Sequence, residues 1–211
     1  LRNLWQPWTE AHAWTLPDTH TAYVPVTDKV DATVRVDALG GGSFRYRYKE
    51  LAPSAKGLSL IANVIHSVDG YVVRSMIRRC SYDPVMVKRA LRTLTEEVPA
   101  SGWVSTDKDV SQLTSLIDKY AETNMVDMSI IPFIHRTNIV YLPMKLKEAL
   151  IKLIESVIEY PPFDIITIHD QFSCHANHVN QMRFHYKEIM AELAESTILS
   201  DIFSTISGNE L

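Results

Sequence analysis

Two short strands joined by a two-residue turn are predicted near the C-terminal end of the chain, and this hairpin constrains the fold more than any other segment. The apolar run 163–168 has the pattern of a buried strand, and 171–174 alternates as a returning strand does. His169 and Asp170 form the turn. Asp is common in turns because its side chain bonds nearby backbone, so the pair alone does not establish a site. A carboxylate held at a hairpin tip nevertheless suits Mg²⁺ binding, which makes Asp170 a candidate catalytic residue.

The composition indicates one compact domain, with or without a large insertion, because the chain has 211 residues of which 46% are hydrophobic. No apolar run approaches the length of a membrane span, so we expect a soluble protein with no membrane partner. Cys80 and Cys174 lack metal-ligand spacing, which suits a reducing compartment, and we expect both to be small buried residues. Because residue 1 is Leu, we expect the chain to be a piece of something larger.

The net charge of -4 gives no global signal for nucleic-acid binding, but two local clusters of basic residues offset it. Arg45, Arg47 and Lys49 alternate along one predicted strand. A larger group follows between residues 74 and 92. Either cluster can be a nucleic-acid contact or a solvated charged face. The second cluster comprises Arg74, Arg78, Arg79, Lys88, Arg89 and Arg92.

The N-terminal part predicts strands, and most of the remainder predicts helices. The glycines at 40–42 turn one strand pair into an antiparallel hairpin. Residues 128–141 look extended. This order favours an α+β or an α/β fold. The predicted strands cover 22–24, 32–36 and 43–48, and the predicted amphipathic helices cover 58–80, 84–97, 109–122, 143–160 and 176–195.

A second group of residues with possible chemistry lies on the predicted helix 58–80. Asn63, His66, Asp69 and Gly70 are three or four residues apart and so share one surface stripe. Asn63 and His66 can donate hydrogen bonds to minor-groove acceptors or sugar hydroxyls, and Gly70 lets a large ligand approach the backbone. The alternative is a polar helix face that satisfies itself, with Asp69 pairing with His66.

Taken together, these two groups strongly resemble motifs of the single-subunit DNA-directed RNA polymerases of phages and mitochondria. The resemblance rests on IANVIHSVDG at 61–70 and TIHDQF at 167–172. In that family the first run lies on a helix of the palm and fingers, and the Asp of the second binds catalytic Mg²⁺. Residues 174–206 resemble the family's closing helix, and HAWTLPD at 12–18 resembles a weaker version of its Trp-x-Thr-Pro segment.

The resemblance implies an α+β fold in which a polymerase palm-type antiparallel sheet has flanking helices and an inserted helical subdomain. Residues 1–80 would hold palm and fingers strands with the DNA-contacting helix. The insertion would be 81–162, and 163–211 would hold the palm catalytic hairpin and the C-terminal helix. The insertion departs from the family pattern, as do Val72, where a His is usual, and Gln171, where relatives carry a small residue. These departures favour a divergent phage member.

The implied activity is DNA-dependent RNA synthesis by nucleotidyl transfer with two Mg²⁺ ions. Asp170 would be the catalytic metal ligand, and Asn63, His66 and His169 would contact the DNA template and RNA product. The second carboxylate, and the Lys and Tyr that select nucleoside triphosphates, match nothing in this chain. We therefore expect an upstream segment or a second subunit, as in a heterodimer, to complete the enzyme. It would work in the host cytoplasm if phage-encoded, or else in the mitochondrial matrix.

Three other functions remain open. A related DNA polymerase could carry the same palm motif. A metal phosphohydrolase of the His-Asp type would need further ligating His and Asp residues on helices, whereas this pair lies in a strand turn. A non-catalytic structural or assembly subunit of a polymerase would use the helices between 84 and 160 for partner contacts.

Overall fold

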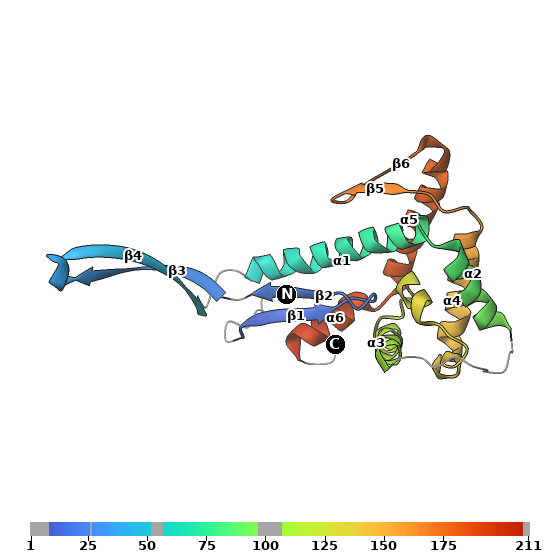
Figure 1. The fold of residues 1–211 in the computed structure, drawn as a ribbon, viewed down its shortest axis with the longest axis horizontal. Coiled ribbons are helices and arrows are strands. Elements are labelled where there is room, and N and C mark those ends of the chain that lie inside the picture. Colours follow the sequence, from blue (N-terminus) through green and yellow to red (C-terminus); the bar gives the residue numbers. More distant parts are fainter. Residues whose placement is uncertain (1–8, 26, 52–56, 97–106, 209–211) are drawn as a thin grey trace.

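The computed structural model describes residues 9–25, 27–51, 57–96 and 107–208, and it combines helices with short antiparallel strand pairs (Figure 1). Within these ranges the strands form three separate two-stranded sheets. The α+β prediction is therefore confirmed as a mixture of helix and antiparallel sheet. The long helix α1 (Gly57–Cys80) runs through the middle of the molecule, with one sheet on either side of it.

Below α1 in Figure 1 lies the first hairpin, made of β1 (Ala11–Thr15) and β2 (Thr21–Pro25). Trp14 and Leu16 are fully buried in a core that includes Val64 of α1. Burying a large apolar side chain stabilises a fold by about 1.5–3 kcal/mol, so this hairpin is a firm support for α1.

The second hairpin, β3 (Thr27–Val36) with β4 (Gly42–Leu51), projects away from the rest of the molecule (Figure 1). Between the strands are the short 3-10 helix η2 (Asp37–Leu39) and two glycines with positive φ, Gly40 and Gly41. Only glycine adopts such angles without strain. The predicted antiparallel hairpin is confirmed, and it is longer than predicted.

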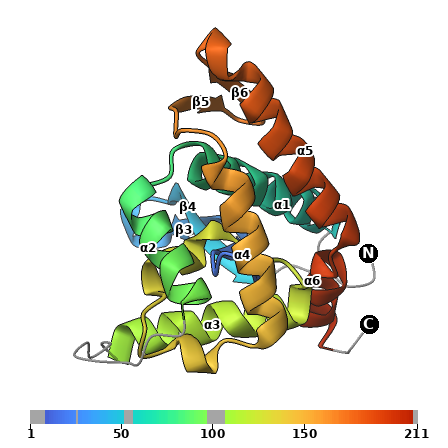
Figure 2. The same cartoon turned by 90° about the vertical axis from the view of Figure 1, so that its right-hand side faces the viewer.

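Periodicity located the long helices correctly, with ends within about three residues of prediction. Asp83 caps the helix that begins at Pro84, because its carboxylate accepts hydrogen bonds from the backbone N–H groups of Val85 and Met86. Figure 2 shows α5 (Val179–Glu195) leading down to α6 (Ile198–Ser207). The helices after α1 are α2 (Pro84–Thr95), α3 (Asp107–Thr123), α4 (Met144–Ile158), α5 (Val179–Glu195) and α6 (Ile198–Ser207).

The prediction that 128–141 is extended was wrong, because this segment forms the 3-10 helices η3 (Met128–Phe133) and η4 (Ile139–Tyr141). Asp127 starts η3 by accepting a hydrogen bond from the backbone N–H of Ser129. The Asn138 side chain bends the next turn, since it accepts from the His135 N–H and donates to the Phe133 carbonyl. Local side-chain hydrogen bonds of this kind compete with extended structure.

The C-terminal helix also differs from its prediction. A short 3-10 helix, η5 (Ala176–His178), precedes α5, and the chain turns at Ser196 and Thr197 before α6 begins. Thr197 causes the turn, because its N–H donates to Thr123 and its hydroxyl to Glu122. None of the helices in the described ranges is both long enough and apolar enough to cross a membrane.

The segment 81–162 leaves and returns to the rest of the chain at adjacent points. The backbone N–H of Phe163 donates to the Cys80 carbonyl at 2.8 Å, and the Ser81 hydroxyl donates to the Phe163 carbonyl at 3.0 Å. The helices α2, α3 and α4 share a hydrophobic core of their own. Cys80 is buried, Cys174 is half-buried, and both thiols are free.

Candidate active site

The hairpin that carries the His-Asp pair is made of β5 (Ile165–Ile168) and β6 (Gln171–Cys174). Ile168 pairs with Gln171, so His169 and Asp170 alone make the turn, and both are exposed. His169 has a φ of 54°, in the left-handed region. This conformation costs a residue other than glycine about 1–2 kcal/mol. The turn is therefore held in a strained form that presents its two side chains to solvent.

A cleft of about 390 Å³ lies between this turn and α1. Its walls come from both predicted motifs, which are about a hundred residues apart in sequence. The structure thus brings His66 and Asp69 to the same cleft as Asp170. Asn63, one helical turn before His66, is exposed and is not among the lining residues. The cleft is lined by His66, Asp69, Gly70, Val73, His169 and Asp170.

Within the described residues no hydrogen bond joins His66 to Asp69, so the pairing considered in the alternative for α1 is not formed. Both side chains are exposed at the cleft. Val72, at the position where the family that the sequence resembles usually has a His, is 7% exposed and packs in the core with Ile189 of α5. Val72 does not line this cleft, but it lines an adjoining pocket that also reaches Asp69 and Asp170.

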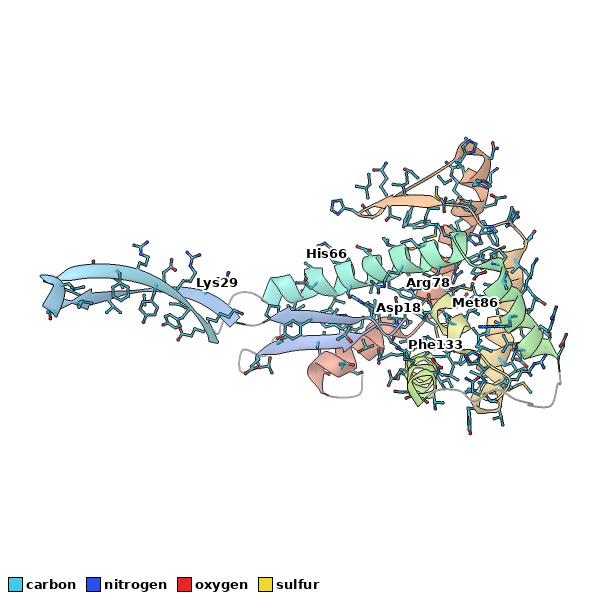
Figure 3. The ribbon with its side chains drawn as sticks, viewed as in Figure 1. Asp18, Lys29, His66, Arg78, Met86 and Phe133 are labelled. Atoms are coloured by element: carbon cyan, nitrogen blue, oxygen red, sulfur yellow. The ribbon has the colours of Figure 1, made fainter. Side chains whose placement is uncertain are left out.

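The β1–β2 hairpin holds α1 in place through polar contacts. The Trp14 indole N–H donates to the Ser67 hydroxyl at 3.0 Å. The turn residue Asp18 accepts from two arginines of α1, from Arg74 Nε at 2.6 Å and Arg78 Nη2 at 3.0 Å. Figure 3 labels Asp18 and Arg78. The segment 12–18 and the 61–70 run are thus in direct contact.

Arg78 extends this network from Asp18 to the 3-10 helix η3. Its Nε lies 2.8 Å from Asp127 Oδ1, and its Nη2 donates to Asp127 Oδ2 at 3.1 Å. Burial alone would raise the pKa of Asp18, but the hydrogen bonds and charges of Arg74 and Arg78 lower that pKa below its usual value. Asp18 therefore stays ionised and holds both guanidinium groups.

The arginines at the end of α1 are not the free basic surface that the sequence suggested. Arg79 is 1% exposed and pairs with Glu192 of α5 through both guanidinium Nη atoms. With Arg74 and Arg78 held by Asp18, the first half of the predicted basic cluster is mainly internal. On α2, Lys88 and Arg89 are exposed, and the exposed Arg92 lies 3.7 Å from Glu96.

The cleft has two residues of the type that binds magnesium. Mg²⁺ prefers carboxylate oxygens, and two carboxylates, Asp69 and Asp170, line the cleft. The described residues contain no group of three His, Cys, Asp or Glu side chains that could hold a metal ion. The exposed Asp170 thus fits the role of one metal ligand, and further ligands would have to come from elsewhere.

The projecting β3–β4 hairpin has two chemically different faces. Its strand register places Arg45, Arg47 and Lys49 on one face together with Lys29 and Arg35. Arg47 donates two hydrogen bonds to Asp31, at 2.7 and 3.2 Å.

The opposite face of this hairpin is apolar and aromatic. Tyr46 and Tyr48 stack with ring centroids 5.8 Å apart, and 44% and 41% of their surfaces are exposed. Phe44, which pairs with Val34, is 54% exposed. Exposed basic and aromatic side chains together are typical of nucleic-acid surfaces. Comparison with protein-family models and with curated proteins gives no match for this chain.

Proposed function

We propose that this chain is the C-terminal palm portion of a single-subunit DNA-directed RNA polymerase, of a divergent phage type. One observation carries the proposal: the two motifs that resemble this family line a single cleft, with His66 and Asp69 on α1 and Asp170 on the hairpin turn. A His-Asp turn without a function would not need a second polar motif facing it across the cleft.

In this proposal Asp170 binds Mg²⁺ from the tip of a rigid turn. Two Mg²⁺ ions, when bound, activate the attacking 3′-hydroxyl and stabilise the pyrophosphate that leaves. His66 and Asn63 contact the template–product duplex from its minor-groove side, and His169 lies against the product end. Minor-groove acceptors vary little with sequence, so such contacts test pairing shape without reading bases.

The other face of the β5–β6 hairpin supports the need for a further polymerase segment or subunit. Ile166 and Ile168 are 67% and 63% exposed, although they belong to a strand that ends beside Asp170. In a complete palm a further segment packed on this face would cover these side chains. The same missing part would supply the Lys and Tyr that select nucleoside triphosphates.

The β3–β4 hairpin supplies a second contact with nucleic acid in this proposal. Its basic face would track the phosphate backbone of the DNA template, which gives affinity without sequence specificity. The site of action follows from the family type: the host cytoplasm for a phage enzyme, or the mitochondrial matrix for a mitochondrial one.

The decisive test is Asp170→Ala in the polymerase assembled with the part that completes it. We expect Mg²⁺-dependent RNA synthesis to fall by more than about 100-fold, since loss of even an outer partner of a metal ligand costs about 10- to 100-fold. DNA binding should remain, because the phosphate-contacting surfaces are unchanged. Filter binding and primer extension measure the two quantities.

The matched control is Asp164→Ala, which removes another exposed carboxylate just before β5 and should leave synthesis unchanged. Near-normal synthesis by Asp170→Ala would refute the assignment. Supplying ribonucleotides and deoxyribonucleotides separately distinguishes the related DNA polymerase, which would use only the latter.

A further inference from the structure

Arg74 occupies an unusual position at the edge of the candidate active site. It follows Gly70 by about one turn of α1 and His66 by about two turns. The buried carboxylate of Asp18, with 3% of its side chain exposed, holds Arg74 Nε at 2.6 Å and Nη2 at 3.1 Å. The remaining nitrogen, Nη1, makes no hydrogen bond with the described part of the chain. The edge of the guanidinium formed by Nε and Nη2 is therefore fixed by Asp18, and the N–H groups of Nη1 are available to a ligand.

The free edge of the Arg74 guanidinium lies close to Gly70. A Cβ atom built at Gly70 would be 3.4 Å from Arg74 Nη1, and no other atom comes within 4 Å by the same measure. The guanidinium thus lies over the one lining residue of the cleft that has no side chain. The side chain of Arg74 is 29% exposed, so the free edge can be reached by a ligand.

The contrast with Arg79 shows that this arrangement is specific to Arg74. Arg79 is 1% exposed and directs both Nη atoms at Glu192, which leaves it unable to meet a ligand. Arg78 lies between Asp18 and Asp127 and uses the Nη2 group for both. Among the three arginines at this end of α1, only Arg74 combines a fixed orientation with an outward donor beside the cleft.

We propose that Arg74 Nη1 donates a hydrogen bond to a backbone phosphate of the nucleic-acid duplex bound in the cleft, an inference that rests on the proposed function. Arg favours phosphate because its planar group presents several charge-assisted donors. Eight residues of helix separate Arg74 from His66, or about 12 Å along α1. A duplex lying along α1 advances about three to four nucleotides over that distance. The phosphate bound by Arg74 would therefore lie about three to four nucleotides from the nucleotide that His66 contacts.

The test measures equilibrium binding of the chain to a short RNA–DNA hybrid across a salt series. Each phosphate contact adds about 0.9 to the slope of log affinity against log salt. Arg74→Gln should lower the magnitude of the slope by about 0.9. The ratio of wild-type affinity to variant affinity should therefore shrink by about 3.5-fold between 50 and 200 mM salt. Arg92→Gln removes an exposed arginine on α2 and should leave the slope unchanged.

A second measurement needs no change in the protein. Single neutral methylphosphonates are placed in turn along each strand of the hybrid, and binding by the wild-type chain is compared. One position, three to four nucleotides from the His66 contact, should weaken binding, and the same substitution should have no effect on Arg74→Gln. His66→Ala, combined with hybrids that each lack one minor-groove acceptor, locates the reference position.

The outcomes separate the two levels of inference. Suppose that the wild-type chain binds the hybrid. The phosphate contact is then refuted if Arg74→Gln retains the full salt slope, or if every methylphosphonate that weakens wild-type binding also weakens binding by Arg74→Gln. The polymerase assignment stands in either case. If the wild-type chain fails to bind the hybrid at any salt concentration, both fail.

Discussion

At the scale of single residues, the buried polar groups around α1 make stability depend on pH. His185 of α5 is 1% exposed, and its Nδ1 has no hydrogen-bond partner within the described chain. Burial first, and then the charge of Arg79, lower the pKa of His185 to about 4. The imidazole is therefore neutral in the folded protein at neutral pH.

We expect the free energy of unfolding to fall as the pH drops from about 6.5 to about 4. In that window the unfolded chain binds a proton at His185 and the folded chain does not, so acid favours unfolding. The difference between the two pKa values corresponds to about 3 kcal/mol. Urea titrations of wild type and His185→Phe at several pH values measure it.

The variant should lose that part of the pH dependence, and above pH 7 the two curves should run parallel because the imidazole is neutral in both states. If the free energy of unfolding changed with pH equally in wild type and in His185→Phe between pH 6.5 and 4, the lowered pKa of His185 would be contradicted. Asp18 acts at lower pH: its lowered pKa stabilises the fold above the ordinary Asp range, and this contribution is lost as the pH falls through the lowered value.

Sequence alone pointed to most residues of the cleft, and also to Asn63, which does not line it, but not to the residues that support the cleft. His66 and Asp170 belong to residue types and motifs with known chemistry. Asp18 and its partner Arg74 are 56 residues apart, and Arg79 and Glu192 are 113 apart. No periodicity links charges at such separations, so the arginines looked like a surface patch.

At the scale of elements, helices were predictable because their apolar stripes repeat with a helical period. The segment 128–141 was not, since its shape depends on single side-chain hydrogen bonds of Asp127 and Asn138. The strand pattern of β3 and β4 correctly predicted an antiparallel hairpin. It could not reveal that the hairpin leaves the body of the protein, because alternation is the same whether the apolar face is covered or not.

We expect the double variant Arg45→Gln/Lys49→Gln to bind nucleic acid with a salt slope lower in magnitude by about 1.8, because two phosphate contacts are lost. Its melting temperature should hardly change, since substitutions at exposed positions usually shift stability by less than about 0.5 kcal/mol. The control is Lys88→Gln/Arg89→Gln on α2, which removes the same charge from another exposed surface. An equal reduction of the salt slope in both double variants would show that nucleic-acid binding depends only on the net charge of the chain and not on this hairpin.

At the scale of the whole molecule, the segment 81–162 is joined to the remainder by more than its two ends. Met125 packs in the same core as Trp14, and Lys119 lies 3.1 Å from Asp201 of α6. Asp127 holds Arg78 of α1 with a carboxylate that is 1% exposed. Contacts of this kind tie the helices of the segment to α1, to the β1–β2 hairpin and to α6.

We therefore expect one cooperative unfolding transition for the whole chain, measured by calorimetry. Asp127→Ala should lower the free energy of unfolding by about 3 kcal/mol, because it leaves part of a buried guanidinium unpaired. The control Asp31→Ala breaks the exposed pair with Arg47 and should cost less than about 1 kcal/mol. Two separate transitions, or equal effects of the two variants, would contradict this coupling.

The projecting hairpin also has a consequence for self-association. In the described chain β3 and β4 pair only with each other, so each strand has an outer edge whose backbone groups are open to a second copy. Charged side chains along both strands, such as Lys29, Arg45 and Lys49, repel such a copy. The side chains proposed to attract phosphate are thus also those that oppose edge-to-edge aggregation, so replacing them with uncharged residues would leave the strand edges less protected.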